Sequence, residues 1–232
     1  IKKDVTMYKI AIVIPTLNEE KFIAQCLDCV IRQTFPFTAI DLMVVDGGSN
    51  DRTKSIVEKY QKRYSNIRFI HNPGRIQSIA FNIGVENSDA PYIVRLDAHA
   101  LYSMDYIEKC IDGLQNDSQI GNVGGRCNIL PFNDTLWAKT NAILNYSRFG
   151  IGGSAFRVGL KPDYVDSVPF GAFPRSVVEK IGGMREDLPR AEDNEYNSRL
   201  RKAGYKVFFN PAIVSSYYAR PTLKASCRQM YA

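Results

Sequence analysis

The sequence lacks any apolar run long enough to cross a membrane. A transmembrane helix needs about 20 predominantly apolar residues, and no run in this 232-residue chain approaches that length. No signal-peptide pattern, internal repeat or low-complexity tract is visible either. With 45% hydrophobic and 23% charged residues, the composition is that of a globular protein. These absences exclude a membrane-spanning, repetitive or disordered chain over this length.

Paired cysteine motifs are almost missing. The five cysteines are odd in number and scattered, and the single CxxC, at residues 26–29, lies inside an apolar helical pattern with no second pair nearby. A zinc site or a redox pair is therefore disfavoured. We expect reduced, mostly buried thiols, as in a cytoplasmic protein. The cysteines are Cys26, Cys29, Cys110, Cys127 and Cys227.

Long blocks of basic residues are missing too, although the formal net charge is +6. This charge suits anionic partners such as nucleotide diphosphates or an acidic membrane surface. It is equally consistent with a basic surface that has no specific partner. The Lys62-Arg63 pair only ends a predicted helix, so we do not expect nucleic acid as a partner. The oligomeric state stays open.

Short apolar runs alternate with helical patterns in the first half of the chain. The runs are continuous rather than alternating, as in strands that are buried on both faces. This order predicts βαβ units, and therefore an α/β fold with a mainly parallel sheet. We expect strands at 10–14, 42–45, 67–70 and 92–96, and helices at about 19–33, 51–64, 77–86 and 103–115.

The second half is less regular. Residues 150–159 are rich in glycine and small residues and are predicted to form a loop. We expect helices at about 176–181, 192–203 and 222–231, and short strands at 207–209 and 213–214. The chain opens at Ile1 rather than Met and reaches Ala232 inside the last predicted helix. We therefore expect it to be part of a longer protein.

Polar clusters follow three of the predicted strands, at residues 15–18, 46–49 and 97–99. In parallel sheets, ligands bind beyond the carboxyl ends of the strands. The three clusters should therefore meet at one edge of the sheet. That convergence is stronger evidence for a site than any one cluster.

Asp97 and His99 are candidate metal ligands. Alternate residues of an extended segment face the same side, so both side chains can approach one cation. A carboxylate with an imidazole suits Mn²⁺ well and Mg²⁺ less well, and two protein ligands leave positions for diphosphate oxygens. The alternative is a strand-end Asp that caps a turn beside a surface His.

Two further groups carry candidate chemistry. Asp46 can accept a hydrogen bond from a base N–H or a ribose hydroxyl, and nearby glycines allow close backbone approach; ordinary turn formation is the alternative, and no Walker pattern is present. Glu192 and Asp193 open a helix with a third acid close behind. The helix dipole favours acids there, but one of them can also act as a general base.

Arg75 can pair with a nucleotide, or can simply be solvated.

Five motifs follow one another along the chain: Pro-Thr-Leu-Asn-Glu-Glu at 15–20, Asp-Gly-Gly-Ser-Asn-Asp-Arg-Thr at 46–53, Asn-Ile-Gly at 82–84, Asp-Ala-His at 97–99 and Glu-Asp at 192–193. Taken together, they resemble glycosyltransferase family 2. The Asp-Ala-His variant, with Gly-Gly-Ser-Ala-Phe-Arg at 152–157 and the Glu-Asp-x-Glu helix at 192–195, resembles the succinoglycan glucosyltransferase subgroup in particular.

The resemblance implies a GT-A fold, with a Rossmann-like, mainly parallel sheet flanked by helices and mixed on the C-terminal side. Residues 1–232 would form one catalytic domain, with a nucleotide-binding part at about 8–118 and an acceptor-binding part at about 119–232. The implied reaction is inverting transfer from a UDP-sugar to a saccharide or lipid-linked saccharide in extracellular polysaccharide biosynthesis. It would take place in the cytoplasm, or at the inner face of the cell membrane with the protein bound peripherally.

The resemblance also assigns roles. Asp97 and His99 would bind Mn²⁺ or Mg²⁺, Asp193 would be the general base, and Glu192 would orient Asp193 or contact the acceptor. The loop at 150–161 would close over the donor. A sugar nucleotidyltransferase is disfavoured, because its first strand should lead into a glycine-rich basic loop; a non-catalytic sugar-nucleotide-binding relative is the other alternative. The expected donor-binding residues are Pro15, Thr16, Asn18, Glu19, Asp46, Gly74, Arg75 and Asp97.

Overall fold

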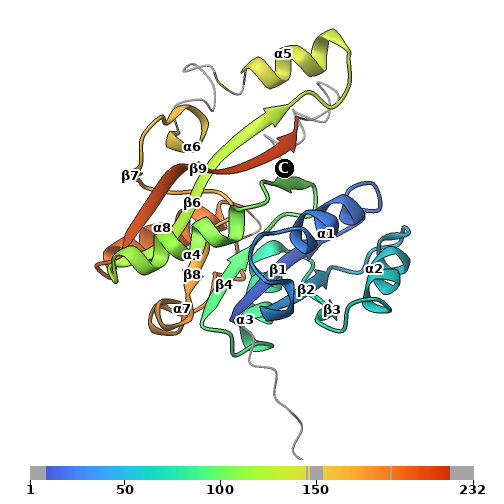
Figure 1. The fold of residues 1–232 in the computed structure, drawn as a ribbon, viewed down its shortest axis with the longest axis horizontal. Helices are drawn as coiled ribbons and strands as arrows, with labels where there is room; N and C mark the ends of the chain where they lie inside the picture. Colours follow the sequence, from blue (N-terminus) through green and yellow to red (C-terminus); the bar gives the residue numbers. More distant parts are fainter. Residues whose placement is uncertain (1–8, 145, 147–153, 189, 220–232) are drawn as a thin grey trace, which may run out of the picture.

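The computed structural model describes residues 9–219 except 145, 147–153 and 189. Within these residues the chain forms one mixed sheet of nine strands, in the order β3-β2-β1-β4-β8-β6-β9-β5, with β7 paired to β9. Helices cover both faces of the sheet (Figure 1). The structure therefore has the expected α/β class, with a mainly parallel first half and a mixed second half.

The first half contains the four predicted parallel strands. Residues of β1 alternate between the two apolar clusters on opposite faces of the sheet, which explains why the strand is apolar throughout. The register pairs Thr16 with Asp46 and Asp46 with His71, so three strand ends lie level at one edge. The strands are β1 (Ile10–Thr16), β2 (Ile40–Asp46), β3 (Ile67–His71) and β4 (Tyr92–Arg95).

The helices of the first half are α1 (Ile23–Ile31), α2 (Thr53–Gln61), α3 (Gln77–Glu86) and α4 (Tyr106–Asn116). A short 3-10 turn, η1 (Phe37–Ala39), precedes β2. The prediction that a helix starts at residue 19 is wrong. Asn18 has a left-handed backbone (φ +56°), and residues 18–20 donate their N–H groups to side chains of another loop. The helix therefore begins only at Ile23.

The second half is built on two long parallel strands, β6 (Ile120–Leu130) and β9 (Lys206–Tyr218). The sequence did not predict β6, and the two short predicted strands at 207–209 and 213–214 are parts of β9. The β6–β9 register shifts between Gly125 and Arg126. A Cβ at Gly125 would lie 2.0 Å from the Ile213 carbonyl oxygen, so only glycine allows this approach.

Smaller elements complete the second half. The strand β8 (Ala172–Pro174) pairs antiparallel with β4 and β6 and joins the two halves. Figure 1 shows α5 beyond the carboxyl end of β6. The other elements are β5 (Ala100–Tyr102), β7 (Asp163–Tyr164), α5 (Leu136–Leu144), α6 (Ala155–Val158), α7 (Arg175–Ile181) and α8 (Glu192–Lys202).

Some predictions concern residues that the structure does not describe. The helix expected at 222–231, Cys227 and residues 150–153 of the glycine-rich segment lie outside the described residues. The loop predicted for 150–159 is wrong at its C-terminal end, where residues 155–158 form the short helix α6. The other four cysteines are free thiols, three of them buried. Among the described residues, no helix combines the length and apolar character needed to cross a membrane.

Candidate active site

A cavity of about 540 Å³ lies at the carboxyl ends of β1, β3 and β4 and reaches the start of α8. It brings together residues from both halves of the chain. Most of the predicted clusters contribute to it, from the loops after three parallel strands and from the Glu-Asp helix. The lining residues are Pro15, Thr16, Leu17, Glu19, Asn72, Arg75, Ile76, Gln77, Asp97, Ala98, His99, Arg190, Ala191 and Glu192.

Asp46 and Asn18 do not line the cavity, and their side chains hold the loops around it. Asp46 Oδ2 accepts hydrogen bonds from the N–H groups of Gly48 and Ser49, and its Oδ1 accepts from the Ser49 hydroxyl. The Asn18 N–H donates to Ser49 Oγ, and Asn18 Oδ1 accepts from the Asn50 N–H. Both side chains therefore fix the loops at the cavity, and the nucleotide contact expected of them stays a prediction.

The same two loops are joined at three further points. The Glu19 N–H donates to Thr53 Oγ1 (2.9 Å), and the Glu20 N–H donates to Asp51 Oδ2 (3.1 Å). The Arg52 N–H and Nε both donate to Glu20 Oε2. The segments 15–20 and 46–53 thus satisfy each other's polar groups. Thr16 and Glu19, from the first of these segments, line the cavity.

Arg75 reaches the cavity through a turn that Asn72 organises. The buried Asn72 accepts hydrogen bonds from the N–H groups of Gly74 and Arg75 and donates to the Ile76 carbonyl. Arg75 itself has a left-handed backbone (φ +65°). Gly74 packs against Ile79, where a Cβ would lie 2.1 Å from a methyl carbon, and does not line the cavity. Asn72 was not predicted, although an Asn-Pro-Gly turn after a strand is a recognisable signal.

Asp97 and His99 both line the cavity, but the geometry expected for them is wrong. The segment is a turn rather than an extended strand, because the Ala100 N–H bonds back to the Asp97 carbonyl (3.2 Å). The Tyr102 hydroxyl accepts from the Asp97 N–H and donates to the Asp97 carbonyl. Cys26 Sγ donates to the same carbonyl. Tyr102 and Cys26 therefore fix the peptide groups that present Asp97.

The His99 ring is paired with a carboxylate. Its Nδ1 lies 3.0 Å from Glu19 Oε1, and the ring meets Tyr217 edge-on at 6.1 Å. Among the described residues, no three His, Cys, Asp or Glu side chains are placed to hold a metal ion together. Asp97 and His99 still offer one oxygen and one nitrogen donor to the same cavity, a set that suits Mn²⁺ when phosphate oxygens complete the shell.

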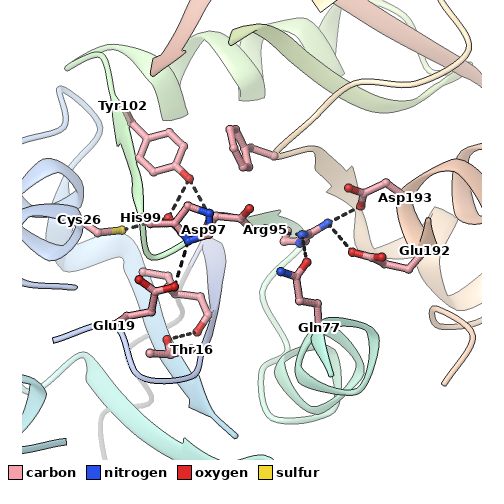
Figure 2. Close-up of polar contacts among 12 residues, drawn as sticks. Thr16, Glu19, Cys26, Gln77, Arg95, Asp97, His99, Tyr102, Glu192 and Asp193 are labelled. Atoms are coloured by element: carbon pink, nitrogen blue, oxygen red, sulfur yellow. Dashed lines mark hydrogen bonds and ion pairs between the residues drawn. The ribbon is translucent and has the colours of Figure 1, made fainter. Parts of the chain in front are cut away.

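Arg95 connects the two halves of the site. Its side chain is only 4% exposed. Nη2 donates to Asp97 (3.1 Å) and to Gln77, while Nη1 contacts Asp193 and lies 3.4 Å from Glu192. Figure 2 shows the guanidinium between Asp97 on one side and the two acids of α8 on the other. Burial alone would lower the pKa of Arg95, but the three carboxylates outweigh this and raise it.

The two acids of α8 differ in their surroundings. Burial, reinforced by the neighbouring Asp193 carboxylate, raises the pKa of Glu192 despite the opposing effect of Arg95. Asp193 does not line the cavity in this structure, but its side chain is 36% exposed and contacts Arg95 directly. Ala191, at the start of the helix, has a left-handed backbone (φ +59°). The sequence did not point to Arg95, although a cation inside an apolar strand was the available signal.

The arrangement of these motifs matches known proteins. The sequence profile for "Glycosyl transferase family 2" matches residues 11–182. The chain belongs to glycosyltransferase family 2. It is 30% identical over 227 residues to the dolichyl N-acetyl-alpha-D-glucosaminyl phosphate 3-beta-D-2,3-diacetamido-2,3-dideoxy-beta-D-glucuronosyltransferase of Methanococcus voltae, covering 95% of this chain and 70% of that protein. It is 31% identical over 215 residues to the succinoglycan biosynthesis protein ExoA of Rhizobium meliloti, covering 91% of this chain and 64% of that protein.

Solved structures of glycosyltransferases share the fold. The mannosyltransferase PcManGT of Pyrobaculum calidifontis, in complex with GDP-Man and Mn²⁺, matches with a TM-score of 0.73 and 21% identity over 95% of this chain and 59% of that one. TarS of Staphylococcus aureus, residues 1–349 with UDP, matches with a TM-score of 0.69 and 16% identity over 92% of this chain and 61% of that one. The GT-A fold that the sequence implied is therefore confirmed.

Proposed function

We propose that this glycosyltransferase family 2 chain is a catalytic domain that transfers a sugar, with inversion, from a UDP-sugar to a saccharide or lipid-linked saccharide in polysaccharide assembly. One observation carries the proposal: Asp97 and His99 from the first half face the same cavity as Glu192 from the second half. Relatives named for glycan and succinoglycan biosynthesis support the substrate class.

The donor would bind in the cavity between the strand ends and α8. Its pyrophosphate carries negative charge, and Arg75 is a cation in the lining. Asp97 and His99 would hold Mn²⁺, or Mg²⁺ less readily, which would neutralise charge on the departing diphosphate. Two fold neighbours, one in complex with UDP and one with GDP-Man and Mn²⁺, support a nucleotide-sugar donor for this chain. Pro15, Thr16 and Glu19 would form the wall on the β1 side.

Asp193 would take the proton from the acceptor hydroxyl. The acceptor oxygen then attacks the anomeric carbon from the face opposite the diphosphate, so a single displacement inverts the configuration. Arg95 contacts the Asp193 carboxylate directly and fixes its orientation. A base must lie within hydrogen-bond reach of its proton, and the exposure of Asp193 leaves a side of it open to an acceptor.

A thermal-shift comparison of UDP, GDP and ADP, each with and without Mn²⁺, tests the donor assignment. Ligand that binds only the folded state stabilises it by about 2.7 kcal/mol at about 100 times Kd. We expect UDP with Mn²⁺ to give the largest rise in Tm. A preference for ADP, or a UDP effect that Mn²⁺ does not change, would contradict the proposal. A preference for GDP would change the expected nucleobase of the donor from uracil to guanine, and the proposed reaction class would still hold.

A further inference from the structure

We propose that Glu19 acts as a positioning residue that sets the tautomer of His99, so that the ring carries its proton on Nδ1 and offers Nε2 to a divalent cation. The inference rests on the proposed function for the role of the cation. Its structural part concerns only the two side chains and stands without any metal.

The contact itself determines the direction of the hydrogen bond. Glu19 Oε1 lies 3.0 Å from His99 Nδ1, and both side chains line the same cavity. An ionised carboxylate can only accept hydrogen bonds, so Nδ1 must be the donor. A neutral imidazole has one N–H and one lone pair, and the lone pair therefore lies on Nε2. Free imidazole in water populates both tautomers; the carboxylate selects one.

Hydrogen bonds to both backbone polar groups hold Glu19 in place. Its N–H donates to Thr53 Oγ1, and its carbonyl accepts from the N–H groups of Phe22 and Ile23. The ring side is also constrained, since Tyr102 fixes the first peptide of the turn that carries His99. The carboxylate and the ring therefore meet as two fixed partners, which gives the contact its selectivity.

A carboxylate behind a metal-binding imidazole has a known physical effect. It fixes the orientation of the ring and makes the other nitrogen a stronger donor to the metal. The tautomer follows from the hydrogen bond that the distal nitrogen makes. A carboxylate in place of His99 would have no tautomer to select. The tautomer effect proposed for Glu19 therefore depends on the imidazole of His99.

The tautomer can be measured directly in the metal-free protein. The chain has two histidines, so ¹⁵N-histidine labelling gives two ring systems, and His71 serves as an internal reference. In long-range ¹H–¹⁵N spectra at a pH where the rings are neutral, we expect His99 to carry its proton on Nδ1. Glu19→Ala should shift His99 toward the Nε2–H form and leave His71 unchanged. In Glu19→Gln the amide oxygen can still accept a hydrogen bond. The fraction of His99 protonated on Nδ1 should therefore lie between those of the wild type and Glu19→Ala.

Mn²⁺ affinity in the presence of UDP gives the second measurement. Loss of such a supporting carboxylate costs about 10- to 100-fold in metal affinity, so we expect Glu19→Ala to weaken Mn²⁺ binding by that factor in calorimetry. Glu20→Ala is the matched control, because Glu20 is the neighbouring acid but pairs with Arg52 outside the cavity. It should leave both the tautomer and the affinity unchanged.

A double variant separates positioning from general loop damage. In a His99→Asp background the ring is gone, so adding Glu19→Ala should no longer weaken Mn²⁺ binding. An equal loss in both backgrounds would overturn the inference, because it would assign Glu19 a merely structural role. A Glu19→Ala protein whose His99 keeps its proton on Nδ1 would also overturn the inference. If the wild-type protein bound UDP without any Mn²⁺ effect, the proposed function would fail, and the tautomer spectra would still decide the inference.

Discussion

The two halves of the molecule bring their site residues to the cavity in different ways. On the first half, the loops after β1 and β2 are joined by several hydrogen bonds between backbone N–H groups and short polar side chains, such as Asn18 and Asp51. On the second half, the two acids at the start of α8 are held by ion pairs to one buried guanidinium, that of Arg95.

This difference affects how each side responds to change. A network of many hydrogen bonds loses little stability when one of them is removed, because each contributes about 1 kcal/mol. A buried charge that balances several carboxylates is different, since its removal leaves them uncompensated. The donor side should therefore be robust to single substitutions, and the α8 side should depend on Arg95.

The largest effect is expected at the α8 side itself. Asp193→Asn removes the proposed base while keeping the size of the side chain, so glycosyl transfer should fall by about 10²- to 10⁴-fold. UDP binding, measured by calorimetry, should remain close to wild type. Glu195→Gln is the control, because Glu195 lies on the same helix but pairs with Arg199. Transfer at the wild-type rate in Asp193→Asn would remove this residue from the chemistry.

Arg95→Met should produce the next largest effect. Without the guanidinium, three carboxylates face one another in a largely buried site, and we expect the free energy of unfolding to fall by about 3 kcal/mol. Urea titration measures this value. Arg185→Met is the comparison, because the Arg185–Asp187 pair is exposed and exposed ion pairs contribute little to the free energy of unfolding. Equal losses of unfolding free energy in Arg95→Met and Arg185→Met would contradict the expected dependence of the α8 side on Arg95.

Asp51→Ala should have the smallest effect, as a test of the donor-side network. Asp51 accepts hydrogen bonds from the N–H of Thr53 in its own loop and from the N–H of Glu20 in the other loop, and loss of such a hydrogen bond costs about 1 kcal/mol. Burial opposes ionisation of Asp51, but hydrogen bonds from Thr53 and Glu20 outweigh it, so the pKa lies below its ordinary 3.8.

A lowered pKa means that the ionised carboxylate stabilises the folded state above pH 3.8, and that this stabilisation is lost as the pH falls through the folded-state pKa. Urea titrations at steps from neutral to acidic pH should therefore show the Asp51→Ala difference shrinking below that value. A difference that stays constant with pH would show that the charge of Asp51 is not what stabilises the loop.

Much of the first half could be predicted because its signals are local. The helix at Gln77–Glu86 was predicted with the observed bounds, and the four parallel strands were placed within one or two residues. The long strand β6 was missed, since two adjacent glycines and a buried Asn122 interrupt its apolar pattern. Its place in the sheet depends on pairing with β9, which lies far along the chain.

The sequence by itself determined which chemical groups stand at the ends of the parallel strands, because strand ends in register must share one edge of the sheet. Only the tertiary structure decided what each group contacts there. Asp46 is satisfied within its own turn, Glu19 pairs with His99, and Arg95 meets Asp193 across 98 positions of the chain. Packing between distant elements determines which groups meet. A buried charge is stable there only when a group of opposite charge lies beside it.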